Sequence, residues 1–323
     1  AAVCALPQRR AEAEAFLDRF EPGAARAALA ELGVEAVCRH AGAYPTGLLE
    51  LADPPAALFV VGGPERLRAL ADAPAATIVG SRRGTPYGLE MAEALGRGLA
   101  AAGLTVVSGL ALGVDAAAHR GACAAPAGGA LAVVACGPEH CYPPANRAVY
   151  EAVLERGCVV SELPPRTPIF RWAFPARNRI MAALARITIV VEARDPSGSL
   201  ITADFASQLG RDVAAVPGRA GAPHCAGSNA LLRDGAHVIL DAADVLDVLF
   251  EGSGPRPEPP PEPQLHDERL RRVFDAVDAV DTAPEIAELC GLSASEVRAA
   301  LGRLEAMGLV RRGGAGQWTR KRT

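Results

Sequence analysis

Several features that define other protein classes are missing from this 323-residue sequence. It has no uninterrupted apolar run of about 18 residues, the length that a membrane-spanning helix needs, and no charged start followed by an apolar stretch. Its eight cysteines are scattered and form no C-x-x-C pair, which argues against a disulfide framework. Only His140 and Cys141, beside Cys136, hint at a metal site. We therefore expect a cytoplasmic protein with reduced thiols, no membrane contact, no metal and no other cofactor.

Lysine and aromatic residues are also scarce. Lys321 is the only lysine, so arginine carries nearly all of the positive charge, and aromatic residues make up 4% of the chain. The formal net charge of −4 excludes a uniformly basic surface, so any site for a polyanion must be local. The apolar content of 50% supports two or three domains with sizeable cores at this length.

The chain is organised around a glycine-rich, basic turn within residues 75–88, AATIVGSRRGTPYG. An apolar, β-branched run leads into the turn and a helical pattern follows it, which predicts strand, loop and helix. Gly80 and Gly84 let the backbone approach a ligand, while Arg82 and Arg83 add charge beside the N–H groups of the helix. The turn predicts a bound phosphate, although it matches neither the dinucleotide nor the P-loop fingerprint. A purely structural turn is the alternative.

Short apolar runs alternate with helical patterns between residues 75 and 250. The expected strands are 58–62, 76–79, 104–107, 130–136, 158–161, 187–191, 213–216 and 237–240. This alternation is typical of a mostly parallel α/β sheet with helices on both faces. Small, hydroxyl-rich turns follow several of these strands, so we expect them to share the carboxyl edge of the sheet and to suit an extended ligand.

The segment 166–186, RTPIFRWAFPARNRIMAALAR, combines five arginines, one tryptophan and two phenylalanines with no acidic residue. Its charged and aromatic positions include Arg171, Trp172, Phe174, Arg177 and Arg179. Such a combination suits a single nucleic-acid strand, because guanidinium groups bind phosphates and rings stack on bases. The alternative is that the rings belong to the core and the arginines pair with distant carboxylates.

Several short motifs follow one another between residues 44 and 240. They are YP at 44–45, IVGSR at 78–82, SGLA at 108–111 with Gly113, Asp115 and His119, YP at 142–143 with Asn146, SE at 161–162, FP at 174–175 with RNR at 177–179, SGS at 197–199 with TA at 202–203, and VPG at 216–218 with Gly227 and Asn229. In order and spacing they resemble the DNA-processing protein DprA (Smf) family.

The resemblance implies an extended Rossmann-like domain and a function without catalysis. Members of this family bind single-stranded DNA in natural transformation, protect incoming strands, form homodimers and help to load the RecA recombinase. By this resemblance we expect single-stranded DNA, RecA and a second copy of the chain as partners.

The resemblance also places the DNA-binding residues. They are Gly80, Ser81, Arg82, Arg83, Ser108, Gly109, Arg171, Phe174, Arg177, Asn178, Arg179, Ser199, Thr202, Gly218, Ser228 and Asn229. Arg82 is expected on a DNA phosphate, with the RNR element beside the same pocket. Arg171 stands where family members commonly have lysine and keeps the positive charge. Whether Phe174 faces a base or the core is open, and Asp115 and His119 suit either a structural or a binding role.

The remaining segments divide the chain into further parts. We expect an N-terminal helical (SAM-like) module with a lead-in at 1–60, the DNA-binding domain at 61–251, a Pro-rich linker at 252–264, and a winged-helix domain at 265–323. In the last part, three helices are expected at 267–279, 284–290 and 293–307, followed by a hairpin. Its third helix balances arginine with glutamate, which does not favour base reading in a major groove. Two roles stay open for this domain: it contacts DNA through the wing and the tail at 320–322, or it docks a protein.

An enzyme is the competing class of function. Rossmann-like nucleotide phosphoribohydrolases of the LOG type use a P-G-G-x-G-T-x-x-E loop, whereas this chain has SGSLITAD at 197–204 and lacks both the double glycine and the glutamate. Glu162 and Glu192 stand at strand ends but have no visible catalytic partner. A nucleotide-sensing protein is a further alternative. We therefore expect no catalytic residues.

Overall fold

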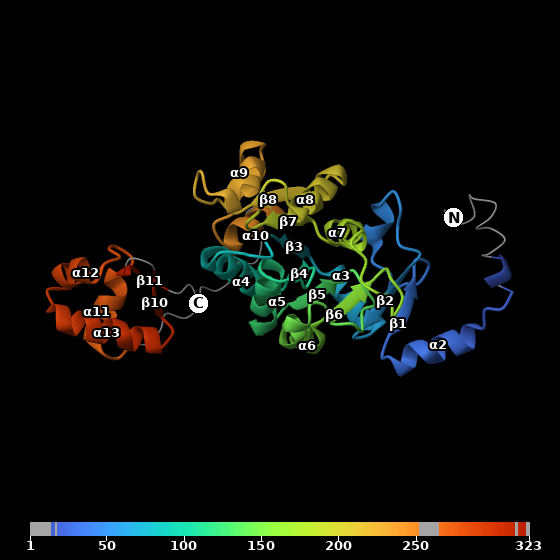
Figure 1. The fold of residues 1–323 in the computed structure, drawn as a ribbon, viewed down its shortest axis with the longest axis horizontal. Helices are drawn as coiled ribbons and strands as arrows, with labels where there is room; N and C mark the ends of the chain where they lie inside the picture. The colour runs from blue at the N-terminus through green and yellow to red at the C-terminus, as the bar shows by residue number, and fades with distance from the viewer. Residues whose placement is uncertain (1–13, 17, 252–264, 314–315, 321–323) are drawn as a thin grey trace. The chain divides into compact units, whose positions relative to one another are not determined.

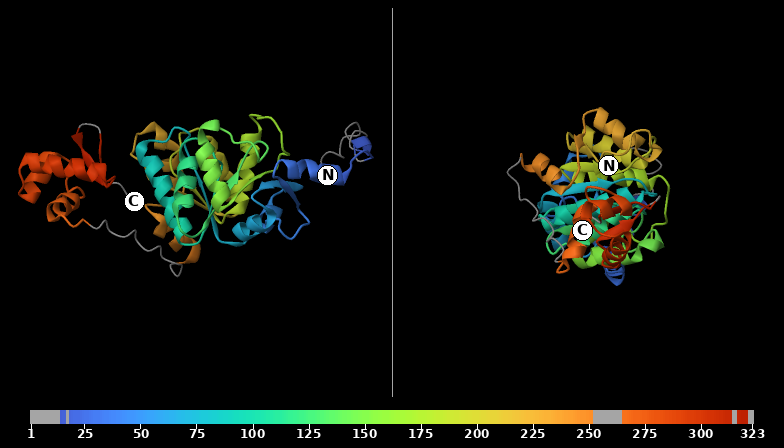
Figure 2. Two further views of the ribbon diagram at one scale, coloured as in Figure 1. Left: turned by 90° about the horizontal axis from the view of Figure 1, so that it is seen from below. Right: turned by 90° about the vertical axis from the view of Figure 1, so that its left-hand side faces the viewer.

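The computed structural model describes residues 14–16, 18–251, 265–313 and 316–320. Cys4, the expected linker at 252–264, and Lys321 and Arg322 of the expected basic tail lie outside these residues. The chain forms two compact units, Ala1–Pro257 and Glu258–Thr323, which are described separately (Figures 1 and 2). Among the described helices, none has the length and apolar character needed to cross a bilayer.

A nine-stranded sheet forms the centre of the described first unit (Figure 1). Its strands are β1 (Glu35–Cys38), β2 (Ala57–Val61), β3 (Ala75–Val79), β4 (Thr105–Ser108), β5 (Gly129–Val133), β6 (Cys158–Ser161), β7 (Ile187–Val190), β8 (Asp212–Ala215) and β9 (His237–Val238). They lie in the order β1-β2-β6-β5-β4-β3-β7-β8-β9. Neighbours from β6 to β9 are parallel, whereas β2 pairs antiparallel with β1 and β6. The expected mostly parallel, Rossmann-like sheet is confirmed.

Helices cover both faces of the sheet, as Figure 2 shows. One face carries α4 (Pro86–Ala101), α5 (Val114–Ala124), α6 (Arg147–Arg156) and α10 (Ala242–Phe250); the other carries α3 (Pro64–Asp72), α7 (Ala173–Leu184), α8 (Gly198–Gln208) and α9 (Ala226–Arg233). Because successive strand side chains point to opposite faces, Val106 packs into the first core and Val107 into the second. Each fully buried leucine or isoleucine in these cores contributes roughly 1.5–3 kcal/mol.

The order of the strands creates a crevice near the middle of the sheet. The chain runs outward from β3 through β4 and β5 to β6, then returns to place β7 on the other side of β3. Helix α4 follows β3 on one face and α8 follows β7 on the other. The loops after these two strands therefore separate at the carboxyl edge, the place where open α/β sheets bind ligands.

The N-terminal part contributes strands as well as a helix. Helix α2 (Pro22–Glu31) starts at a proline after Glu21 and buries none of its side chains. β1 follows it and extends the sheet, a strand that the sequence pattern did not predict, and the expected domain border at 60/61 falls inside β2. Only Val37 of β1 is buried, so this edge strand lacks the continuous apolar run by which a strand is predicted from sequence.

The second unit has the three helices and the hairpin expected of a winged helix. They are α11 (Glu268–Ala276), α12 (Ala283–Cys290), α13 (Ala294–Ala306), and the antiparallel strands β10 (Val310–Arg312) and β11 (Trp318–Arg320). Ser293 caps α13 in a capping box with Glu296. A separate core that includes Phe274, Leu301 and Trp318 holds the unit together.

Candidate nucleic-acid interface

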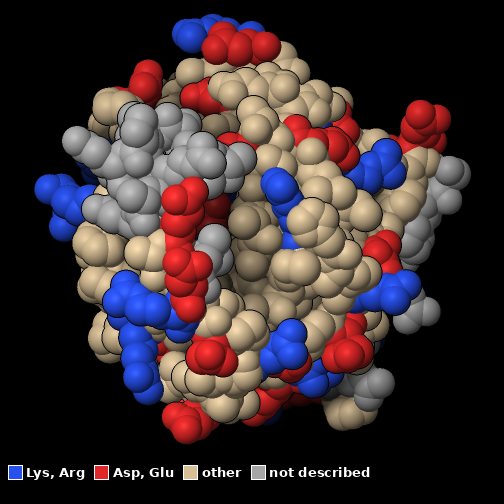
Figure 3. All heavy atoms as spheres, turned by 90° about the vertical axis from the view of Figure 1, so that its right-hand side faces the viewer, with Lys and Arg blue, Asp and Glu red and all other residues tan. Residues whose placement is uncertain are grey.

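A cavity of about 590 Å³ opens between the loops that follow β3 and β7. Nine of the expected DNA-binding residues line it: Gly80, Ser81, Arg82, Arg171, Phe174, Arg177, Asn178, Ser199 and Thr202. Four arginines contribute to its wall, and Asp115, itself buried, is the only acidic residue among the lining residues. The cavity therefore offers a local positive site in a chain with a net charge of −4. On the face shown in Figure 3, basic and acidic side chains are interspersed.

Backbone hydrogen bonds fix the turn after β3. The Ser81 N–H donates to the Glu192 carbonyl oxygen at 2.7 Å, and the Ser81 carbonyl oxygen accepts from the Val114 N–H at 3.1 Å. The Ser81 hydroxyl oxygen accepts from the Arg83 N–H at 3.1 Å. These bonds occupy the main chain of Ser81, so the exposed Arg82 is the group of this turn that remains available to an anion in the cavity. Arg83 is exposed but does not line the cavity.

The N-terminus of α8 faces the same cavity. Ser197 caps this helix by accepting from the Ser199 N–H, and the two hydroxyls are 2.9 Å apart. The Thr202 hydroxyl is buried and has no hydrogen-bond partner in the described structure. Unpaired N–H groups and the positive end of the helix dipole suit an anion at this position.

Aromatic rings line the cavity beside these polar groups. Phe174, in the first turn of α7, is half-buried and lines the cavity, so its ring is not enclosed in the core. The Arg82 guanidinium lies 5.0 Å from its ring centroid, and the Tyr142 ring is 6.2 Å away. Arg171, one turn earlier, is exposed at the rim. Guanidinium groups and aromatic rings thus lie side by side in this cavity.

The RNR element is more deeply buried than a surface contact would be. The Arg177 guanidinium donates to the Val133 carbonyl oxygen and lies under Gly109, where any β-carbon would collide with it. Burial raises the pKa of Asp115 and lowers that of Arg177, and the opposite charges of these two groups counteract both shifts. Arg82, Phe174 and Arg177 also line an adjoining cavity of about 80 Å³, and Gly109 lines this second cavity alone. Arg177 thus forms a buried part of the cavity wall, held by its contacts with Val133 and Gly109.

The other two members of the RNR element hold helices in place. The Asn178 amide donates to the Gly198 carbonyl oxygen at 3.0 Å and so ties α7 to the start of α8. Arg179 pairs with Glu162 at 2.7 Å. Arg179 is not among the residues that line the cavity.

Several expected DNA-binding residues lie apart from the cavity and have structural partners. The buried Ser108 hydroxyl donates to the Ile78 carbonyl oxygen at 2.6 Å, and that of Ser228 donates to the Cys225 carbonyl oxygen at 3.2 Å. The Asn229 amide bonds both the N–H and the carbonyl oxygen of Gly218, at 3.0 and 3.1 Å. These contacts organise the strand ends.

Comparison with known proteins places this architecture in one family. The family model for "DNA recombination-mediator protein A" matches residues 35–250, and the "DprA winged helix domain" model matches residues 256–316. The chain belongs to the DprA family. It is 36% identical to the DNA processing protein DprA of Bacillus subtilis over 245 residues, 75% of this chain and 81% of that protein. It is also 36% identical to Protein Smf of Escherichia coli over 278 residues, 83% of this chain and 72% of that protein.

Solved DprA structures share the fold. The X-ray structure of DprA from Streptococcus pneumoniae matches with a TM-score of 0.63 and 36% identity, over 68% of this chain and 76% of that chain. DprA from Helicobacter pylori matches with a TM-score of 0.60 and 30% identity, over 68% of this chain and 96% of that chain. The H. pylori structure gives insight into a unique single-stranded DNA binding mode of that protein.

Some lining residues of this DprA family member were not among the DNA-binding residues expected from the sequence. Arg194 and Pro196 follow β7, Tyr142 precedes η3 (Pro144–Asn146), and Ile169 precedes α7. Arg194 gave a signal that could have been used, because it is a basic residue in the loop after an apolar strand, at the carboxyl edge of the sheet. Near Ile169, the exposed rings of Phe170 and Trp172 stack on each other at 5.8 Å and 18°.

The acidic residues considered for catalysis have structural partners. Glu162 pairs with Arg179, and the Glu192 carboxylate accepts from the N–H and the hydroxyl of Thr85 at 2.8 and 2.5 Å. Cys136 contacts the carbonyl oxygen of His140 through its sulfur, at 3.6 Å. These contacts give each of the three residues a role in holding loops together.

Proposed function

We propose that this DprA family member binds single-stranded DNA in the cavity between the loops after β3 and β7. In this proposal it protects incoming strands during natural transformation and helps to load the RecA recombinase. It acts in the cytoplasm as a homodimer and catalyses no reaction. Residues 61–251 carry the DNA site, and residues 265–323 form a separate winged-helix domain.

The observation that carries the proposal is that guanidinium groups without an ion-pair partner and an accessible aromatic ring line the same cavity. Neither Arg82 nor Arg171 forms an ion pair with any described residue, so both are available to phosphates. The Phe174 ring lies beside Arg82 and faces the cavity. Charge and stacking surface within one cavity are what a single strand requires.

A single strand fits this cavity better than a duplex. A base can reach the Phe174 ring only if it leaves the base stack, because the ring lines a recess and does not stand on an open surface. Bases of a single strand are already free to turn outward. We therefore expect strong preference for single strands and little preference for sequence.

The edge of the sheet supports the homodimer. β9 is the last strand in the sheet order, and Val238 and the nearby Leu240 are each 55% exposed. An exposed apolar edge strand is a template for pairing with another chain, and we propose a second copy of this chain as the occupant. Light scattering should report a dimer for the unaltered protein and a monomer for Val238→Glu. A monomer in both would contradict the homodimer and leave DNA binding to be judged separately.

Fluorescence anisotropy over a salt series tests the DNA proposal. We expect the unaltered protein to prefer a labelled single strand over a duplex, with affinity that falls as salt rises. Arg82→Ala and Arg171→Ala should each weaken binding and reduce the slope of log affinity against log salt by about one. Arg68→Ala is the matched control, because it removes the same charge from an exposed side chain on α3 paired with Asp72. Equal binding by all four proteins would contradict the site.

Two further assays address the finer parts of the proposal. RecA assembly on a single strand coated with single-strand-binding protein should be faster with the unaltered protein than with Arg82→Ala. Incubation with a nucleoside monophosphate should release no free base. Release of base, lost in Glu192→Gln, would instead favour a phosphoribohydrolase.

A further inference from the structure

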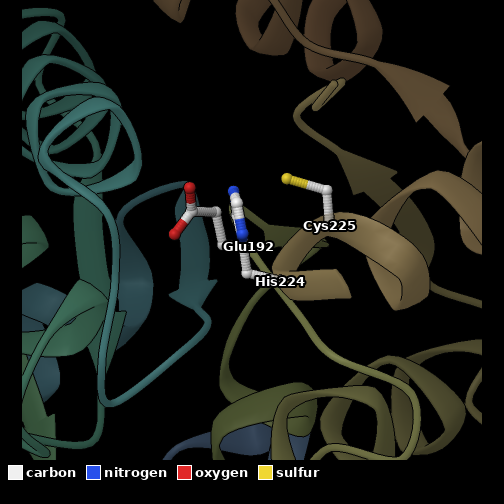
Figure 4. Close-up of side chains that lie close together, drawn as sticks. All are labelled: Glu192, His224 and Cys225. Atoms are coloured by element: carbon white, nitrogen blue, oxygen red, sulfur yellow. The ribbon is translucent and has the colours of Figure 1, made fainter. Parts of the chain in front are cut away.

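Three side chains with metal-binding atoms converge outside the proposed DNA cavity. Glu192 follows β7, while His224 and Cys225 belong to η4 (Pro223–Cys225). A carboxylate oxygen, an imidazole nitrogen and the cysteine sulfur lie within 4.8 Å of one another. In Figure 4 the sulfur points toward the His224 ring, and Glu192 lies on the other side of that ring.

We propose that Glu192, His224 and Cys225 form a zinc site. Zn²⁺ accepts oxygen, nitrogen and sulfur ligands together and has no strict geometric demand of its own. With bonds of about 2.0–2.3 Å, neighbouring ligands of a tetrahedral ion are about 3.5 Å apart, so each pair of ligand atoms needs to close by no more than about 1.3 Å. His224 is only partly buried, which leaves a fourth position for water.

The buried charge of Glu192 favours a cation at this place. Glu192 is 1% exposed, and its carboxylate accepts its hydrogen bonds from Thr85, which is neutral. Within the described ranges, no lysine or arginine pairs with it. A buried carboxylate without a counter-charge is unfavourable, and each of its oxygens has a further lone pair for a metal.

The cysteine supplies the second negative ligand when the metal binds. Cys225 is 2% exposed, and a cysteine thiol without a bound metal ordinarily carries its proton at neutral pH. Binding replaces the S–H bond by a Zn–S bond and releases one proton to solvent. Space for the sulfur depends on Gly218, since a β-carbon there would lie 2.1 Å from it.

The site would add a second link between two segments that already meet through the hydrogen bond from the Gly227 N–H to the Ala193 carbonyl oxygen, 2.8 Å. Glu192 also accepts, through its carbonyl oxygen, the N–H of Ser81 in the turn that carries Arg82. Bound zinc therefore ties the segment after β8 to the residue that positions this turn. Because the ion binds the folded chain, it should raise the melting temperature as its concentration rises.

Cobalt substitution tests the site. Metal-free protein containing both units is titrated with Co²⁺ in the presence of a phosphine reductant, which contributes no thiol. We expect one equivalent to produce a near-ultraviolet thiolate-to-cobalt band and visible bands typical of four-coordinate cobalt, and Zn²⁺ to remove both. Cys225→Ser should abolish the thiolate band.

His140 and Cys141 provide a matched control, because they are also adjacent in sequence but belong to no group of three converging ligand atoms among the described residues. His140→Gln combined with Cys141→Ser should leave the cobalt spectrum unchanged. An unaltered protein without the thiolate band, or a band that survives Cys225→Ser, would overturn the proposal.

A second variant decides the matter if Cys225→Ser does not fold. His224 is partly buried, so His224→Gln should fold like the unaltered chain, which circular dichroism can check. Competition with a chromophoric chelator should then show a loss of zinc affinity greater than the roughly 10–100-fold that changes of outer partners cause. Unchanged affinity in His224→Gln would contradict the site.

Discussion

The Arg82 guanidinium carbon lies 5.0 Å from the centroid of the Phe174 ring. The two residues are far apart in sequence, one in the turn after β3 and the other at the start of α7, so the fold itself makes them neighbours. A cation over a ring contributes roughly 0.5–1 kcal/mol at an exposed site. The contact therefore holds in place, without any ligand, the two groups that we propose bind a phosphate and stack on a base.

Replacing Phe174 by leucine should separate stacking from charge. We expect affinity for single strands to fall by about 1–3 kcal/mol, because a base loses its aromatic partner, while the salt slope stays the same because no cation is removed. Anisotropy at several salt concentrations measures both. A change of slope without a change of affinity would contradict the assigned role of the ring.

Trp172 should report DNA directly. The sequence has two tryptophans, and the other, Trp318, is 9% exposed in the core of the second unit, whereas Trp172 is 59% exposed beside Phe170. We expect single-stranded DNA to quench tryptophan fluorescence by stacking on Trp172, and the quenching to disappear in Trp172→Phe. Quenching that persists in Trp172→Phe would show that these rings lie outside the path of the strand.

Arg177 should matter more for stability than for contact with DNA. Its removal leaves the Val133 carbonyl oxygen without this donor and the buried Asp115 carboxylate without the nearby guanidinium that favours its charge, so we expect Arg177→Met to lose roughly 1–3 kcal/mol of unfolding free energy. Adding Asp115→Asn should recover part of the loss, because it removes that charge. Urea unfolding measures all three proteins. A double variant less stable than Arg177→Met would contradict this coupling.

His119 should make the protein sensitive to acid. Burial lowers the pKa of His119 to about 4, and neither ring nitrogen has a hydrogen-bond partner in the described structure. Because the folded-state pKa lies below the unfolded value of about 6.5, its contribution is fully present above pH 6.5 and is lost as the pH falls toward 4.

We expect this residue to account for a loss of about 2 kcal/mol between pH 7 and pH 5. His119→Leu should lack that part of the pH dependence while other acid-sensitive groups keep theirs. Urea unfolding of both proteins at the two pH values gives the difference. Parallel curves for the two proteins would contradict the prediction.

The sequence predicted the strands well because most are continuous apolar runs that need no context. The run at 158–161 becomes β6, and that at 76–79 becomes most of β3. β1 was missed, since it lies at the edge and buries only Val37. Its pairing with β2 is a tertiary contact, which local sequence patterns do not predict.

Individual site residues were harder to predict than their position on the sheet. Small hydroxyl residues at the carboxyl ends of strands look alike in sequence, yet Ser199 lines the cavity while Ser108 and Ser228 are buried against the main chain. Arginine likewise looks the same whether it is exposed, as at Arg82, or buried, as at Arg177. Burial depends on packing between distant segments, so only the structure distinguishes these cases.

The double hydrogen bond between Asn229 and Gly218 has a consequence for how this chain tolerates change. The Asn229 side-chain amide bonds to Gly218 as a peptide group of a neighbouring strand would. These bonds fix the two ends of the loop from Gly218 to Asn229. Within this loop, residues 219–221 are exposed. Lengthening a loop with fixed ends adds little entropy cost. The protein therefore has a built-in place for extra residues, where sequences can grow or a label can be inserted without disturbing the sheet.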